Sequence, residues 1–270
     1  MIIGGTEPAV SVFMMLFRRL GTLARSLADL ARQDYRGPWQ LMLWNNNYPE
    51  RDFVDEVVSS YRTRIDVEIV HSERNHHCVA RQSLAAIAQG ELIVMIDDDI
   101  LPGPGYISHF VAAHRRLATE SMRPVAICAC GHRFSHAIAG ASAQDVWEKR
   151  RGLQFLDSNH PESDVHFMHA NNCMMPRDLM LKVAACPPPD PEFGLVDDYW
   201  MSYVLSNRLD VRTIKIEAAS VLDFASDAFD PGIAMFNRRD VHEARLKLFA
   251  YLSQHGWPAL YDHQAVTGKA

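Results

Sequence analysis

Short apolar runs alternate with longer amphipathic segments along the first half of this 270-residue chain. The runs have the length of buried strands and occupy residues 9–17, 39–46, 66–72 and 92–96. The segments between them carry apolar residues at helical spacing and occupy residues 20–35, 49–64 and 79–91. Gly90 stands where a C-cap would end the third helix. Strands that alternate with helices predict a parallel sheet covered by helices on both faces.

The pattern of the second half is less regular. Helical spacing marks residues 105–119, 176–184, 196–209 and 238–256. Apolar or alternating runs predict strands over residues 124–134, 166–176 and 211–216. Three consecutive prolines at 187–189 predict a loop, and no repeat or low-complexity linker divides the chain. We therefore expect a single α/β domain over residues 1–270.

Composition narrows the class of protein. The formal net charge is -6, whereas a protein that binds nucleic acid through bulk charge needs a basic face. No apolar run reaches the roughly 18 residues of a membrane span, and the start of the chain lacks the basic segment of a signal peptide. The five cysteines are odd in number and irregularly spaced, which is typical of reduced, mostly buried thiols. We expect a cytoplasmic protein that has no transmembrane segment and binds no nucleic acid.

Three consecutive aspartates, Asp97, Asp98 and Asp99, directly follow the fourth apolar run. In parallel α/β sheets, ligands bind beyond the carboxyl ends of the strands. Adjacent carboxylates raise one another's pKa unless a cation shares them. Two interpretations are open: a solvated turn, or a site for a hard divalent cation such as Mn²⁺ or Mg²⁺. In an extended chain Asp97 and Asp99 would share one side, and Asp98 would face the other.

The neighbouring segments carry a resemblance to a known family. Asn75, Ala80-Arg81, the segment Ala88-Gln89-Gly90-Glu91 and the three aspartates stand in the order found in nucleotide-sugar glycosyltransferases of GT-A fold. The chain resembles the large inverting family 2 first, and most specifically in its middle third. This resemblance implies a Rossmann-like, mainly parallel mixed sheet flanked by helices. It places a nucleotide-sugar half at about 8–125 and an acceptor half with a C-terminal helix or flap at about 126–250.

One stretch departs from family 2. Trp44-Asn45-Asn46 stands where that family usually has an aspartate, and it resembles the exostosin-type α-N-acetylhexosaminyltransferases. Those proteins also have adjacent acidic residues before the acceptor helix and a late basic motif. The nearest matches here are Asp197-Asp198 and Phe236-Asn237-Arg238. Family 2 enzymes invert the anomeric configuration and exostosin-type enzymes retain it, so the stereochemistry stays open.

The resemblance also implies roles for the acidic residues. Asp97 and Asp99 would contact the metal and the diphosphate, with Asp98 towards the ribose. Asp198, or its neighbour Asp197, would be the acceptor-side carboxylate, which acts as general base in an inverting enzyme. The simpler alternative for this pair is a favourable interaction with a helix dipole.

Further candidates follow from the same resemblance. Arg238 would contact the leaving diphosphate. The nucleotide-binding candidates are Phe17, Arg18, Asn45, Asn46, Asn75 and Arg81. The candidates for the wall around the donor sugar and acceptor are His169, Asn171, Asn172 and Trp200. For Arg81 a surface helix position is an equal alternative, and for Trp147 and Trp200 core packing is the default.

These features predict a metal-dependent hexosyl- or N-acetylhexosaminyltransferase. It would move a sugar from a nucleoside diphosphate sugar, with UDP favoured, to a hydroxyl group of a glycan or small molecule. Mn²⁺ or Mg²⁺ would be the cofactor. Two alternatives are a nucleotidyltransferase of related fold, which would need a glycine-rich phosphate loop beside the first strand, and a non-catalytic nucleotide-sugar-binding module.

Overall fold

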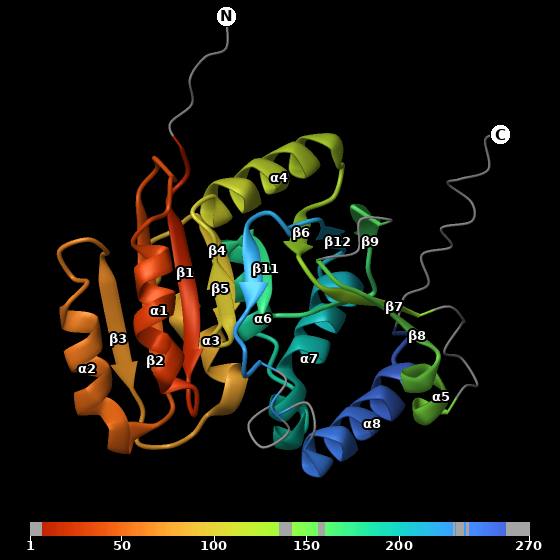
Figure 1. Cartoon of the computed structure of the whole chain (residues 1–270). Coiled ribbons are helices and arrows are strands. Elements are labelled where there is room, and N and C mark those ends of the chain that lie inside the picture. Colours follow the sequence, from red (N-terminus) through yellow and green to blue (C-terminus); the bar gives the residue numbers. More distant parts are fainter. Residues whose placement is uncertain are drawn as a thin grey trace, which may run out of the picture.

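A computed structural model describes residues 7–134, 142–155, 160–228, 230, 235 and 238–257. An eight-stranded mixed sheet forms its centre, in the order β3-β2-β1-β4-β11-β6-β12-β9 (Figure 1). The parallel half comprises β1 (Val10–Leu16), β2 (Trp39–Asn45), β3 (Val67–His71) and β4 (Leu92–Asp97). The other half comprises β11 (Asn172–Pro176), β6 (Val125–Cys128), β12 (Arg212–Ile216) and β9 (Glu162–Asp164). The predicted mixed, mainly parallel α/β sheet is therefore confirmed.

The first half follows the predicted alternation closely. The connecting helices are shorter than predicted and comprise α1 (Leu20–Leu30), α2 (Arg51–Ser59) and α3 (Ala80–Ile87). The prediction of a C-cap at Gly90 is wrong, because the chain is already extended at Ala88, where ψ is 143°. Gly90 instead lies against β1, where an added Cβ would stand 2.4 Å from the backbone nitrogen of Ser11. A glycine is needed there because the two backbones approach closely.

Helices bury the parallel half on both faces. On one face, Phe13 and Met15 of β1 share a hydrophobic cluster with Leu84 of α3. On the other face, Val12 and Met14 share a second cluster with residues of α1 and of α4 (Tyr106–Glu120). Strands covered on both faces read as continuous apolar runs, which is why this half was visible in the sequence.

The second half departs from the prediction in its strands. The run at 124–134 is two strands, β6 of the main sheet and β7 (Gly131–Phe134) of a small sheet in the order β10-β7-β8. The run at 166–176 likewise divides into β10 (Phe167–Met168) and β11. An added Cβ at Gly131 would lie 2.6 Å from the carbonyl oxygen of Phe167, so glycine permits the close pairing of β7 with β10.

Several short elements had no periodic signal. They are α5 (Ala143–Glu148), β8 (Arg150–Leu153), β9, and the paired strands β5 (Ile100–Pro102) and β13 (Leu222–Phe224). The predicted helix at 196–209 is α7 (Asp197–Tyr203) followed by a π-helical turn over Val204–Arg208. The predicted helices α6 (Arg177–Ala184) and α8 (Arg239–Gln254) are present.

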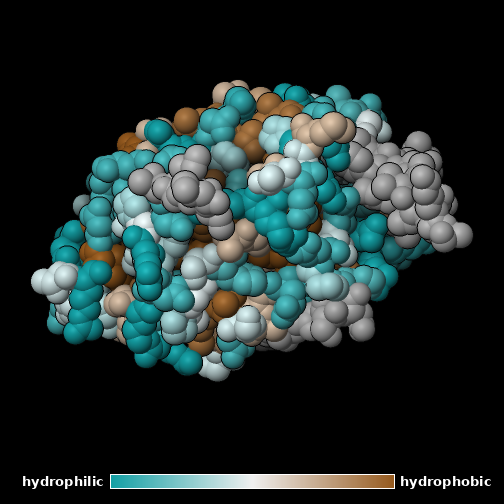
Figure 2. Space-filling model, turned by 90° about the horizontal axis from the view of Figure 1, so that it is seen from above, coloured by the Kyte–Doolittle hydropathy of each residue, from teal (hydrophilic) through white to brown (hydrophobic). Residues whose placement is uncertain are grey.

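The remaining sequence predictions concern thiols and membranes. All five cysteines are free, and Cys128, Cys130 and Cys173 are buried. Over the described ranges, no helix combines the length and apolar character that crossing a bilayer requires. Seen from above, the face at the amino ends of the parallel strands is covered mostly by hydrophilic residues (Figure 2).

Candidate active site

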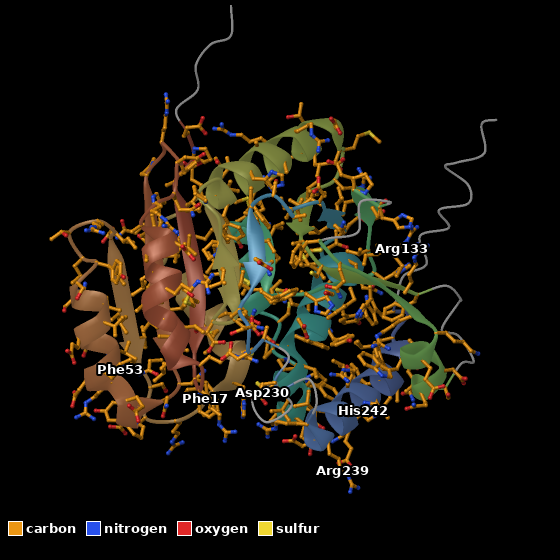
Figure 3. All side chains as sticks on the ribbon, viewed as in Figure 1. Phe17, Phe53, Arg133, Asp230, Arg239 and His242 are labelled. Carbon is orange, nitrogen blue, oxygen red and sulfur yellow. The ribbon has the colours of Figure 1, made fainter. Side chains whose placement is uncertain are left out.

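A cavity of about 560 Å³ opens at the carboxyl ends of β1 and β4. Two groups of side chains in its wall carry most of its charge. The first, the aspartate cluster, comprises Asp97, Asp98, Asp99, Asp197 and Asp198 with Arg19 and Arg81. The second, the Trp147 cluster, comprises His132, Trp147, Arg150, His169 and Arg245. Figure 3 shows Phe17 just below the end of β1, and His242 on α8, the helix that also carries Arg245.

Asp97, Asp98 and Asp99 do not keep the alternation expected of an extended chain. Asp97 is the last residue of β4, whereas Asp98 and Asp99 form a turn into β5. Nη1 of Arg19 lies 3.4 Å from Oδ1 of Asp98 and 3.0 Å from Oδ2 of Asp99. The turn therefore brings these two carboxylates to one arginine, and Asp97 faces another, Arg81.

Arg81 joins the two acidic segments. Its Nη2 lies 3.7 Å from Oδ1 of Asp97, and its Nε lies 3.2 Å from Oδ2 of Asp197. Its Nη1 also donates to the carbonyl oxygen of Ala170 at 2.9 Å. The side chain is only 4% exposed, so this cation is an internal bridge rather than a surface helix residue. Residues 100 positions apart in sequence thus share one charged centre.

Burial raises the pKa of three aspartates in the cavity wall. It raises the pKa of Asp98 to about 6 and that of Asp99 to about 7, with a further contribution from Asp97 and opposition from Arg19. Burial also raises the pKa of Asp198 to about 7, helped by the negative charge of Asp197. Among the described residues Asp198 has no ion pair, whereas Asp197 is held by Arg81. Asp198 is therefore the carboxylate of this pair that is poised to exchange a proton near neutral pH.

The chemistry of the aspartate cluster fits a divalent cation bound together with a ligand. Oδ1 of Asp99 is buried and has no hydrogen-bond partner in the described part of the chain. No three histidine, cysteine or acidic side chains there are arranged to enclose a metal ion by themselves. Mg²⁺-type sites commonly use one or two carboxylates and complete their shell with phosphate oxygens, so the two observations are compatible.

Two members of the Trp147 cluster, Trp147 and Arg150, stand on α5 and β8, short elements that the pattern did not predict. Nε2 of His169 lies 3.3 Å from Nε2 of His132. Burial and the nearby arginines lower the pKa of His169 to about 4, and burial with His169 lowers that of His132 to about 2. Both imidazoles are therefore neutral at physiological pH. The guanidinium groups of Arg150 and Arg245 lie over the Trp147 ring.

The structure brings most of the predicted site residues to this cavity. Those that line it are Phe17, Arg18, Asn46, Asn75, Arg81, Asp97, Asp98, Asp99, His169, Asn171, Asp197 and Asp198. Asn46 also ties two loops together, because its side chain accepts from the backbone of His76 and donates to the carbonyl of His77.

Four predicted residues lie elsewhere. Asn45 is buried and closes the loop after β2 by bonding with Asn47. Asn172 is buried and accepts from the hydroxyl of Tyr106. Trp200 is 1% exposed and donates to the carbonyl of Cys186, so it belongs to the core. Arg238 is exposed at the start of α8 and pairs with Asp240. Phe236 and Asn237 lie outside the described residues.

Other cavity residues were missed in the sequence. They include Arg19, His132, Arg150, Tyr199 and Arg245. Arg245 had a usable signal, because it occupies the apolar face of α8 that Val241, Ala244 and Leu248 define. A charged residue on such a face needs a partner or a cavity. His132 and Arg150 had none, since they stand on short strands without a periodic pattern.

Comparison with known proteins places this geometry in a family. Residues 11–183, most of the chain, match the model of glycosyl transferase family 2. Validoxylamine A glucosyltransferase of Streptomyces hygroscopicus subsp. limoneus is 31% identical over 109 residues, which are 40% of this chain and 24% of that protein. The chain spans less than half the length of the curated relatives that it matches.

Solved structures share the fold. GalNAc-T7, crystallised with UDP, GalNAc and Mn²⁺, is 12% identical with a TM-score of 0.57, over 81% of this chain and 43% of that one. S. aureus TarS 1-349 in complex with UDP is 13% identical with a TM-score of 0.54, over 97% of this chain and 75% of that one. At these identities the likeness establishes the GT-A fold alone. The match to the family model over residues 11–183 shows that the chain belongs to glycosyl transferase family 2.

Proposed function

We propose that this protein is a metal-dependent glycosyltransferase. It moves a sugar from a nucleoside diphosphate sugar, with UDP as the nucleotide, to a hydroxyl group of a glycan or small molecule. The observation that supports this best is the bridge of Arg81 between Asp97 and Asp197. It holds an acidic strand end and an acidic helix start at one cavity, and transfer between two substrates needs charged groups on both sides.

The acidic end of β4 suits the departing nucleoside diphosphate. Asp97 and Asp99 would hold Mn²⁺ or Mg²⁺, which when bound supplies positive charge to the departing diphosphate. Arg19 keeps Asp98 and Asp99 in place through its own contacts at 3.4 and 3.0 Å. Phe17 and Asn75 line the same cavity and are our candidates for the nucleotide. The solved structures of GalNAc-T7 with UDP and Mn²⁺ and of TarS with UDP make this donor class the first to test.

The acidic start of α7 suits the activation of the acceptor hydroxyl. With its pKa raised to about 7, Asp198 can take the proton of the attacking hydroxyl as a general base near neutral pH. Asp197 would position it by keeping α7 tied to Arg81. A general base on the acceptor side predicts an inverting reaction, whereas a retaining enzyme would use Asp198 to stabilise positive charge on the sugar.

The decisive experiment is a screen for release of UDP from UDP-glucose, UDP-N-acetylglucosamine and UDP-N-acetylgalactosamine, with Mn²⁺ and with EDTA. We expect release from one donor that EDTA abolishes. UDP binding without release from any donor would instead indicate a binding module. NMR of the anomeric proton of a transfer product then decides between inversion and retention.

A further inference from the structure

Two imidazole rings face each other in the cavity wall. Nε2 of His169 lies 3.3 Å from Nε2 of His132, and the two ring planes stand at 78° with their centroids 4.7 Å apart. His132 is 6% exposed and stacks on Phe167. Both rings are neutral, and a neutral imidazole has one N–H donor and one bare nitrogen. One of the two Nε2 atoms must therefore donate and the other accept.

The surroundings of His132 decide which ring donates. Its other nitrogen, Nδ1, is buried and has no hydrogen-bond partner in the described part of the chain. A buried N–H without an acceptor is costly and rarer than a buried acceptor without a donor, so Nδ1 is the bare nitrogen. The proton of His132 is then on Nε2, which donates to Nε2 of His169. It follows that His169 carries its own proton on Nδ1.

This Nδ1–H group of His169 is open to the cavity. The residue lines the cavity, and within the described ranges its ring bonds only with His132. Its Nδ1 is not one of the buried, unpartnered atoms, so a ligand in the cavity can accept from it. The ring is also held in place, because its edge meets Phe167 and its backbone N–H donates to the carbonyl of Cys130 at 3.0 Å.

The segment around His169 lies between the proposed base and the proposed leaving-group site. At one end, Oγ of Ser202 on α7 accepts from the end of β10 and donates to the carbonyl oxygen of Asp198 at 2.8 Å. At the other end, the backbone N–H of Asp97 donates to the carbonyl oxygen of Asn171 at 3.1 Å. The sugar that is transferred has to lie between base and leaving group, so His169 stands beside it.

We propose that His132 is a positioning residue that fixes His169 as a hydrogen-bond donor, through Nδ1, to a hydroxyl oxygen of the transferred sugar. This inference rests on the proposed function, because it assigns a contact with the sugar of the same nucleotide donor. A fixed donor also gives specificity, since a sugar that places no oxygen at this point leaves the N–H group unpaired.

Long-range ¹⁵N–¹H NMR of the imidazole rings tests the two tautomers directly. In the wild-type protein we expect His132 to be protonated on Nε2 and His169 on Nδ1, with the signals of His169 identified by their loss in His169→Phe. His132→Phe keeps a ring against Phe167 but removes the donor, so His169 should no longer be held in the Nδ1–H form. A proton on Nε2 of His169 in the wild-type protein would overturn the proposal.

Calorimetry with Mn²⁺ measures whether the tautomer matters for the sugar. The probes are UDP, UDP-glucose, UDP-N-acetylglucosamine and UDP-N-acetylgalactosamine. We expect His132→Phe to weaken the tightest of the three sugar nucleotides about fivefold and UDP less than twofold, because only the sugar loses a hydrogen bond. His132→Gln, whose amide N–H can replace the Nε2–H group, should recover part of the loss. Equal losses for UDP and the sugar nucleotide would overturn the proposal.

A double-substitution cycle shows whether His132 acts through His169. His169→Phe should weaken the sugar nucleotide at least as much as His132→Phe does, and the double variant no more than His169→Phe alone. Additive losses would mean two independent contacts and would overturn the proposal. The matched control is His114→Phe, a buried histidine on α4 that bonds to the carbonyl of Val125 away from the cavity. It should keep the wild-type ratio of sugar-nucleotide to UDP affinity.

The failure of this inference can be told apart from failure of the proposed function. If the wild-type protein releases UDP from none of the three donors, the proposed function is contradicted, and the NMR tautomers and binding affinities still report on His132 because neither needs turnover. If UDP is released but His132→Phe keeps the wild-type affinity ratio, this inference alone is overturned.

Discussion

The aspartate cluster and the Trp147 cluster line one cavity but differ in how their charge is arranged. In the first, Arg19 and Arg81 contact four of the carboxylates, and the fifth, Asp198, has no ion pair with any described residue. In the second, the guanidinium groups of two arginines lie over one ring, and the nearby histidines are neutral. The comparison teaches that the arginines of one part of the wall are held by carboxylates, whereas those of the other part pack on an aromatic ring.

The largest effect on activity is expected from removing the proposed base in the aspartate cluster. Asp198→Asn keeps the shape of the side chain but cannot accept the proton, so we expect the kcat of transfer to fall about 10³-fold. Steady-state kinetics with the preferred donor measures this. The matched control is Asp178→Asn, on the exposed side of α6 where it pairs with Lys182, and it should be silent. If kcat falls only a few-fold in Asp198→Asn, another residue must be the base.

Removing the proposed metal ligand Asp99 should reduce activity by a smaller factor. Asp99→Ala deletes a buried carboxylate oxygen without a partner, and we expect Mn²⁺-dependent UDP release to fall about 100-fold, since a bound cation contributes several kcal/mol. Asp223→Ala, an exposed change on β13 beside β5, serves as the control. Unchanged Mn²⁺ dependence in Asp99→Ala would show that the aspartate cluster does not hold the metal.

The pH dependence sharpens the role of Asp198. Its ionised form is the active one, so kcat should rise about tenfold per pH unit below about 7 and level off above it. Its pKa is higher in the folded state than the ordinary value of about 4, so the folded state holds the proton longer than the unfolded state does. Its contribution to stability therefore declines as pH rises from about 4 to about 7. Denaturant unfolding across that window, compared with Asp198→Asn, checks the sign.

We expect the smallest effect on activity from a change at Trp200, because this residue belongs to the core and not to the site. Trp200→Phe removes a buried ring and its hydrogen bond to Cys186, so unfolding free energy should fall by about 2 kcal/mol. We expect kcat and KM to stay within about twofold, because the side chain does not line the cavity. A large rise in acceptor KM at unchanged stability would restore the sugar-stacking interpretation.

The two clusters also differ in how far the sequence predicted them. The three aspartates follow an apolar run that is buried on both faces, and a run of this kind is visible without any knowledge of its partners. Asp197 and Asp198 stand at the start of a predicted helix. Both segments were therefore placed correctly in the fold, and both reach the cavity.

The local sequence pattern could not predict the Trp147 cluster, for a physical reason. His132 and Arg150 stand on four-residue strands whose pairing, β7 with β8, is set by contacts rather than by a repeating pattern. The predicted strand at 124–134 hid this, because the chain bends at Ala129 and Cys130, and β7 then pairs with β10 from another segment, where Phe167 lies close to Gly131. Arg245 alone carried a local signal, as a charge on an apolar helix face.

By itself, the sequence determined that four strands alternate with helices, that three carboxylates close the fourth, and that the family is one of nucleotide-sugar transferases. Hydrophobic periodicity encodes such features locally, since burial on a sheet face or helix face is a property of each segment. The tertiary structure alone decided that Arg81 joins Asp97 to Asp197, that Trp200 belongs to the core, and that two arginines share Trp147. These relations are contacts between residues far apart in the chain, which exist only after the segments have packed.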